Sequence, residues 1–234
     1  MKKLLFPSLA LNFVFLLGLF LLYSYFPVYK NGLIRKKIVT HQERRIQQFS
    51  ELPTTEGSYV FWGDTRLEEA NWEELLQNPK VKNRGNSGET LKDFMQNMGH
   101  IVKAKPAKLF LLMGYQDLLE GKSPDEIYKS YGELIASLKK QLPKTVIYLH
   151  SLPPTAPDLH KSVTNNEQVL ITNGKLKDLA QKYETYYIDL WSALVAENNS
   201  NALNVAKYSN DGYHLNAAAY TRWKGLIEQY TKND

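Results

Sequence analysis

The stretch Lys108-Leu-Phe-Leu-Leu-Met113 (KLFLLM), stopped by Gly114, decides the fold of this chain. A short run that is apolar at nearly every position is typical of a strand buried on both faces of a sheet. Two further runs of this kind are SYVFW at 58–62 and TVIYLH at 145–150. Such strands occur almost only in parallel sheets that helices cover on both sides, so the sequence predicts an α/β fold.

Helical patterns separate these strands. Ser123-Pro124-Asp125-Glu126 is a capping box with proline at the first helical position, which predicts a helix start. The alternation predicts a three-layer, doubly wound, mainly parallel sheet, whose binding sites lie beyond the carboxyl ends of the strands. The expected helices cover 68–76, 90–102, 124–141, 166–183 and 216–230, a further strand covers 185–190, and a weaker strand covers 80–85.

The amino terminus carries an uncharged run, Leu4–Phe26, after a tail of residues 1–3. As a helix this run is about 34 Å long, enough to cross the hydrocarbon core of a bilayer. A cleaved signal peptide would have a shorter apolar region and small residues at the cleavage site, and the Tyr-Ser-Tyr-Phe-Pro at 23–27 is a poor site. We therefore expect one uncleaved transmembrane helix over 4–26.

Residues 27–56 are expected to form a basic stalk or linker, followed by the soluble domain at 57–234. The stalk is a helix in one interpretation and a segment on anionic lipid headgroups in the other, and both can hold. Lys2 and Lys3 favour a cytoplasmic amino terminus, whereas the cluster at 30–37 favours the opposite orientation. Because very short amino-terminal tails commonly stay in the cytoplasm, we expect an extracytoplasmic domain.

The charge distribution argues against a nucleic-acid partner. Residues 1–50 carry a net charge of +7, whereas residues 51–234 carry a net charge of −2. A slightly acidic globular part is a poor surface for tracking phosphates. The chain has no Cys, which excludes disulfides, thiolate metal sites and a cysteine nucleophile, and its other residues suggest no metal or cofactor.

Four segments place polar side chains after strand ends or near the carboxyl terminus. They are residues 63–65, 83–90, 114–117 and 211–216. A hydroxyl nucleophile needs a base, the base needs an orienting carboxylate, and the developing oxyanion needs N–H donors. In this chain Thr65 is the candidate nucleophile, His214 the base and Asp211 the carboxylate. The oxyanion donors are then the amides of Thr65 and Gly88 with the Gln116 side chain, and the same segments contain the site-lining candidates Asp64, Asn86 and Asp117.

Each segment also has a purely structural interpretation. Thr65-Arg-Leu-Glu68 is a capping box, and Ser87-Gly-Glu-Thr90 is a possible helix start. Asp211 and His214, taken alone, fit a turn and a surface histidine. The remaining histidines fall in no ligand pattern and are treated as structural: His41, His100, His150 and His160.

The order of these segments resembles that of the SGNH/GDSL hydrolase superfamily, a flavodoxin-like α/β fold that includes esterases, lipases and carbohydrate deacetylases. The resemblance covers about residues 57–232 and is carried by NRGNSGETL at 83–91, SLPPT at 151–155 and YSNDGYHLNAAAYTRW at 208–223. It implies that Asp211 and His214 are the Asp-x-x-His pair of that family and that Gly88 is its oxyanion glycine.

Two signature positions depart from the family pattern. Gly-Asp-Ser becomes Gly63-Asp64-Thr65, and Gly-x-Asn-Asp becomes Gly114-Tyr-Gln-Asp117. The threonine methyl restricts χ1 and crowds the attack path, and glutamine places its amide one methylene further out. Loss of one oxyanion donor typically lowers turnover by a factor of ~100–1,000, so both changes bear on activity.

The resemblance implies an esterase or deacylase that hydrolyses a small carboxylic ester, and the apolar run at 4–26 adds the expectation that it is membrane-anchored. An O-acetylated envelope glycan and a lysophospholipid are both open as substrates. Two alternatives remain: a catalytically weak or inactive module that binds a glycan or a protein at the membrane, and an O-acyltransferase that uses the same residues. The sequence leaves the acyl length and the oligomeric state open.

Overall fold

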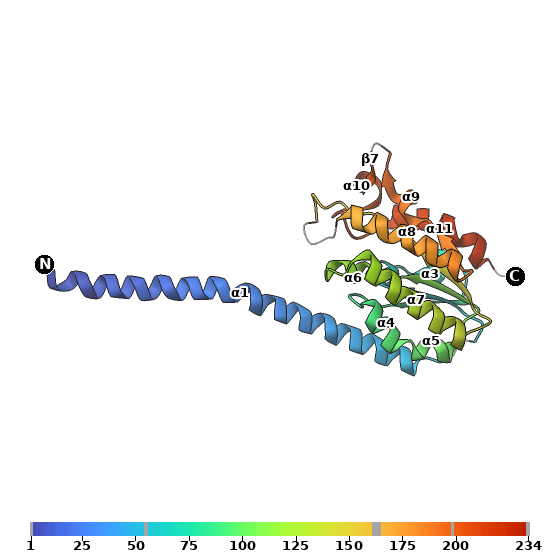
Figure 1. The fold of residues 1–234 in the computed structure, drawn as a ribbon, viewed down its shortest axis with the longest axis horizontal. Helices are drawn as coiled ribbons and strands as arrows, with labels where there is room; N and C mark the ends of the chain where they lie inside the picture. The colour runs from blue at the N-terminus through green and yellow to red at the C-terminus, as the bar shows by residue number, and fades with distance from the viewer. Residues whose placement is uncertain (1, 54–55, 161–164, 198, 233–234) are drawn as a thin grey trace. The chain divides into compact units, whose positions relative to one another are not determined.

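A computed structural model describes residues 2–53, 56–160, 165–197 and 199–232 (Figure 1). The chain divides into two compact units, Met1–Arg44 and Arg45–Asp234. Helix α1 (Lys2–Glu51) accounts for the first unit and ends immediately before the Leu52–Gly57 segment.

Helix α1 contains the apolar run expected over 4–26. Its side chains from residue 11 to residue 40 are exposed. Among the described residues it is the helix that is long and apolar enough to cross a membrane, with a mean hydropathy of 1.9 in its most apolar window. This test rests on length and composition alone.

The second unit is built on five strands, all paired in parallel in the order β2-β1-β3-β4-β5. This is the flavodoxin-like order of a doubly wound sheet, so the predicted parallel α/β sheet is confirmed. The three central strands are almost fully buried, as their apolar runs predicted. The strands are β1 (Tyr59–Gly63), β2 (Val81–Gly85), β3 (Lys108–Leu112), β4 (Val146–His150) and β5 (Tyr186–Ile188).

Helices cover both faces of this sheet. Helix α11 packs against α3 and α9, whereas α7 packs against α4 and α8. Right-handed crossovers place these two groups on opposite faces. The helices are α2 (Thr65–Glu68), α3 (Trp72–Leu76), α4 (Leu91–Asn97), α5 (Gly99–Ala104), α6 (Tyr115–Leu119), α7 (Pro124–Gln141), α8 (Asn166–Lys182), α9 (Leu190–Leu194), α10 (Val205–Tyr208) and α11 (Ala217–Thr231), and a hairpin adds β6 (Val195–Ala196) and β7 (Asn199–Leu203).

The helix expected over 68–76 is two short helices instead of one. The side-chain amide of Asn83, on β2, donates to the carbonyls of Leu67, Glu68 and Ala70 at 2.9, 3.1 and 2.9 Å. These bonds take carbonyls that a continuing helix would use internally, so α2 ends at Glu68. The helix expected over 90–102 is likewise divided, at Met98.

Two glycines lie side by side at the carboxyl ends of β1 and β2. Gly63 pairs with Gly85 in the register of the two strands. A Cβ on Gly63 would lie 2.0 Å from the carbonyl oxygen of Leu112, and one on Gly85 would lie 2.3 Å from the backbone nitrogen of Glu68. Helix α2 therefore packs directly on these strand ends, which places Thr65 at the carboxyl edge of the sheet.

Candidate active site

The turn after β1 presents Thr65 as the first residue of α2. The N-cap is Asp64, whose side chain accepts a hydrogen bond from the backbone N–H of Arg66 at 3.0 Å. The alternative in which Thr65 caps the helix and Glu68 reaches back is therefore wrong. Glu68 instead accepts hydrogen bonds from Ser87. Thr65 is half-buried, and its hydroxyl is not needed as the cap.

Asp211 and His214 form a closed turn near the carboxyl terminus. Oδ2 of Asp211 lies 2.6 Å from Nδ1 of His214, and Oδ1 accepts the backbone N–H groups of Tyr213 and His214 at 2.9 and 2.8 Å. Desolvation acts to raise the pKa of Asp211, but these hydrogen bonds outweigh it and hold the pKa well below its usual range. These bonds favour the carboxylate form of Asp211, which lies in contact with the imidazole.

The other ring nitrogen of His214 faces a residue that the sequence did not single out. Nε2 lies 3.7 Å from Oε1 of Glu69, at the end of α2. Burial raises the pKa of Glu69, and the nearby His214 and Arg66 oppose that rise. Within the described chain no hydrogen bond joins Oγ1 of Thr65 to Nε2 of His214. The structure thus forms the carboxylate–imidazole pair and leaves the hydroxyl outside it.

Arg66 connects the Thr65 turn to the histidine turn. Its guanidinium is fully buried, and its carbon lies 4.3 Å from the ring centroid of Tyr115 and 4.2 Å from that of Tyr213. Burial raises the pKa of Tyr213 to about 12, and its phenol lies close to the Thr65 side chain. The two segments that carry the candidate nucleophile and base are therefore packed against each other.

The loop after β2 supplies the candidate oxyanion glycine. The N–H of Asn86 donates to the carbonyl of Gly63 at 2.8 Å, which ties this loop to the nucleophile turn. Asn86 is fully buried, whereas Gly88 is half-exposed in the left-handed region with φ of +77°. The next helix starts at the capping box of Thr90 and Asp93, so the start considered at Ser87 is wrong.

The segment after β3 carries Gln116 where the family pattern has its oxyanion asparagine, and its amide is bound to a neighbouring side chain. Gly114 has a φ of +106° and precedes α6, on which Nε2 of Gln116 donates to Oε1 of Glu120 at 3.2 Å. Asp117 is fully buried and accepts the N–H of Leu91 at 2.8 Å and the ammonium of Lys122. Asp117 therefore anchors α4 to α6, and one amide hydrogen of Gln116 is engaged within its own helix.

Two side chains near the site, Glu69 and Arg66, escaped the sequence analysis, and His160, which it treated as structural, also lies near His214. The His160 ring lies 5.2 Å from that of Tyr213 and 6.3 Å from that of His214. His150, by contrast, is the last residue of β4 and is fully buried, and this burial lowers its pKa to about 4. The sequence offered no signal for Glu69 or His160, because each meets His214 only through the tertiary fold.

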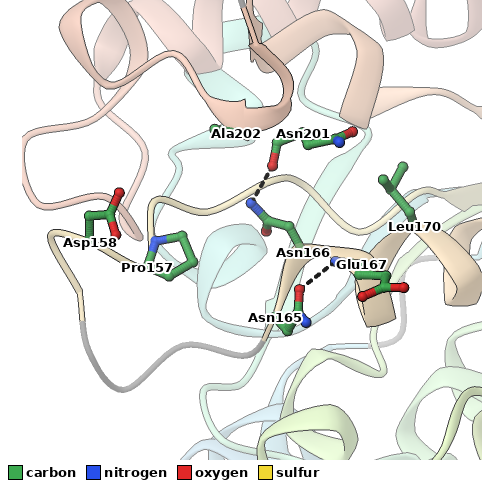
Figure 2. Close-up of a pocket in the computed structure, with 8 residues that line it drawn as sticks. All are labelled: Pro157, Asp158, Asn165, Asn166, Glu167, Leu170, Asn201 and Ala202. Carbon is green, nitrogen blue, oxygen red and sulfur yellow. Dashed lines mark hydrogen bonds between the residues drawn. The ribbon is translucent and has the colours of Figure 1, made fainter.

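A pocket of about 530 Å³ lies beside the segment that follows β4 (Figure 2). This segment also contacts the histidine turn, because the N–H of Ala156 donates to the carbonyl of Gly212 at 2.8 Å. Asn166 in the pocket is held by Thr155 and by the carbonyl of Asn201. The pocket is lined by Pro157, Asp158, Asn165, Asn166, Glu167, Leu170, Asn201 and Ala202.

Comparison with solved structures shows the same fold in other proteins. A Streptococcus pneumonia structure matches with a TM-score of 0.78 and 22% identity, covering 88% of this chain and 99% of that one. A GDSL-like lipase from Bacteroides thetaiotaomicron matches with a TM-score of 0.69 and 20% identity, covering 81% and 96%. An acetyl-xylooligosaccharide esterase from Geobacillus Stearmophilus, a mutant form, matches with a TM-score of 0.59 and 15% identity, covering 78% and 98%.

The comparison with curated proteins finds no match. The model of the GDSL-like Lipase/Acylhydrolase family matches residues 49–222, which contain the turn at Thr65, the loop at Gly88 and the Asp211–His214 pair. The match spans most of the chain and agrees with the parallel sheet and its strand order. The chain therefore belongs to the GDSL-like lipase/acylhydrolase family.

Proposed function

We propose that this protein hydrolyses a small carboxylic ester with Thr65 as nucleophile, His214 as base and Asp211 as the orienting carboxylate. The observation that carries the proposal is the 2.6 Å contact between Asp211 and Nδ1 of His214, next to the turn that presents Thr65. A carboxylate on Nδ1 fixes the tautomer that leaves Nε2 free to accept a proton.

In this mechanism Oγ1 of Thr65 attacks the ester carbonyl while its proton passes to Nε2 of His214. The Nε2 atom must first exchange its contact with Glu69 for the Thr65 hydroxyl. The protonated imidazole then gives its proton to the leaving alcohol, and a covalent acyl-Thr65 remains. Water, activated by the same imidazole, hydrolyses this ester and restores the hydroxyl.

The negative charge on the carbonyl oxygen needs N–H donors. The backbone amides of Thr65 and Gly88 are the proposed donors, together with the second amide hydrogen of Gln116, since one is already donated to Glu120. Because Asp117 is buried and fully engaged, it supports this site without touching the substrate.

The lining of the neighbouring pocket supports a polar substrate. Its side chains are mostly amides and carboxylates, which suit the hydroxyl groups of a glycan better than a lipid acyl chain. An O-acetylated glycan is therefore the favoured substrate over a lysophospholipid. We propose that α1 spans a membrane, because of its length and composition. We propose the extracytoplasmic side for the hydrolase domain, because very short amino-terminal tails commonly stay in the cytoplasm.

Turnover of acetyl and longer acyl esters by the full chain tests this function. Thr65→Ala and His214→Ala should each abolish it, and a fluorophosphonate probe should label Thr65 in the unaltered protein only. Activity that survives intact in either variant would reject the mechanism.

The contacts of Nε2 with Glu69 and of Gln116 with Glu120 favour one rival, a module that binds a glycan without cleaving it. That rival predicts no labelling and no turnover until Thr65→Ser and Gln116→Asn are combined. Transfer of the acyl group to a sugar would use the same residues, and product analysis with a glycan acceptor separates it from hydrolysis.

A further inference from the structure

The Glu68 side chain joins the two halves of the proposed site. Its Oε2 accepts the backbone N–H of Ser87 at 2.7 Å and the Ser87 hydroxyl at 2.5 Å. Glu68 lies on α2 with Thr65, and Ser87 directly precedes Gly88. The carboxylate therefore fixes the distance between the nucleophile turn and the oxyanion loop, defined here as residues 85–88.

The last turns of α1 supply the cation that faces this carboxylate. Nε of Arg45 lies 3.4 Å from Oε1 of Glu68, and Nη2 donates to the carbonyl of Gly85 at 2.9 Å. One guanidinium thus contacts both the α2 side and the strand end from which the oxyanion loop departs. The Arg45 and Glu68 side chains are only 26% and 16% exposed, so the ion pair is less screened than a surface pair.

A second contact holds Arg45 in this place. Its guanidinium carbon lies 4.6 Å above the ring of Phe49, one turn further along α1. Phe49 is buried, stacks on His100 and has the guanidinium of Arg84 5.2 Å from its centroid. The end of α1 is therefore packed into the hydrolase unit, which begins at Arg45.

We propose that Arg45 is a positioning residue for the oxyanion loop, acting through Glu68 and the carbonyl of Gly85. Arg45 precedes the residues that the family model matches, which begin at residue 49. The segment next to the membrane helix thus completes the hydrolase site. The inference rests on the proposed acylhydrolase function for its kinetic effect and on the hydrogen-bond geometry alone for its structural effect.

The test uses the full chain in detergent and compares Arg45→Met with Arg44→Met, a substitution of its exposed neighbour. Hydrogen exchange of a peptide over residues 83–90 reports the Ser87 amide directly. We expect faster exchange there in Arg45→Met, with unchanged exchange in β1 and β3 as proof that the fold is intact. Equal exchange over 83–90 in the two variants would overturn the proposal, whether or not the protein is active.

The kinetic arm separates positioning from general stability. Arg45→Met should lower kcat about ten-fold with little change in KM, because a displaced oxyanion donor acts in the transition state. Arg45→Lys keeps the charge but lacks the forked guanidinium, so its kcat should lie between those of the unaltered protein and Arg45→Met. In a double-mutant cycle Arg45→Met and Glu68→Gln should be non-additive, and full additivity would refute the link.

Absence of turnover in the unaltered protein would reject the proposed function, and the exchange result would then decide the role of Arg45 by itself.

Discussion

The carboxylate of Glu69 faces Nε2 of His214 at 3.7 Å, the ring nitrogen that receives the hydroxyl proton in the proposed mechanism. The imidazole therefore has a carboxylate at each nitrogen, Asp211 at Nδ1 and Glu69 at Nε2. The carboxylate beside Nε2 competes with the Thr65 hydroxyl for the same position on the ring.

Glu69→Gln should accordingly raise kcat/KM, because the neutral amide holds Nε2 less strongly than the carboxylate and leaves it to the Thr65 hydroxyl. The side chains of His214 and Glu69 are both partly exposed, so the pair is worth ~1 kcal/mol at most and the gain is limited to about five-fold. The measurement is kcat/KM relative to the unaltered protein, with the exposed Glu74→Gln as the control. An unchanged kcat/KM would show that Glu69 does not act on the base.

Thr65→Ser should raise kcat, because the serine hydroxyl keeps the nucleophile and removes the methyl that restricts χ1. We expect a gain of about ten-fold, equivalent to ~1.4 kcal/mol in the activation free energy. Burst kinetics with an activated acetyl ester measure the acylation rate, and Thr65→Ala, which lacks the hydroxyl, gives the background rate. A slower serine variant would mean that the pocket is shaped around the threonine methyl.

Gln116→Ala should cost less than the loss of a dedicated oxyanion donor. Because Nε2 of Gln116 also donates to Glu120, the amide is not aimed at the carbonyl oxygen alone. We expect kcat to fall about ten-fold instead of the ~100–1,000-fold typical of such a residue. Glu120→Ala releases the amide and should raise kcat; a fall in kcat would show that the Glu120 contact positions Gln116 productively.

Glu89→Gln should stabilise the protein at pH 8 and not at pH 5. Burial raises the pKa of Glu89 from 4.5 to about 7, so the folded state holds a proton that the unfolded state releases between these values. Stability is therefore fully present below pH 4.5 and lost as the pH rises through 7, by about 3 kcal/mol. Glutamine keeps an oxygen for Asn97, whose amide donates to Glu89 at 2.9 Å.

Thermal unfolding at the two pH values measures this effect. Thr90→Ala would instead remove the side chain that accepts the backbone N–H of Asp93, and it should destabilise the protein at both pH values, which makes it the matched comparison. A pH-independent change in Glu89→Gln would contradict the assigned pKa.

The sheet was predictable because its central strands are apolar on both faces. A short continuous apolar run such as KLFLLM is typical of a strand in a parallel sheet covered on both sides. The start of α7 was predictable because capping chemistry is local. The division of the helix expected over 68–76 was not predictable, because the side chain that causes it, Asn83, reaches the helix from strand β2. The hairpin of β6 and β7 was also missed, because strands of two and five residues are too short to give a periodic signal.

The candidate site divides in the same way. Asp211 and His214 are three residues apart and could be paired from sequence. The contact of Gln116 with Glu120 has helical i to i+4 spacing and was available in principle. The positions of Glu69, Arg66 and Arg45 depend on which segments the fold brings together, and no local rule supplies that.

The paired glycines at positions 63 and 85 set a limit on how the sequence of this domain can be diversified. A saturation library would tolerate change on the outer turns of α7 or α11, but even alanine at either glycine would collide with backbone atoms of Leu112 or Glu68. Variants that keep the fold should therefore carry their changes in the loops, with glycine held constant at positions 63 and 85.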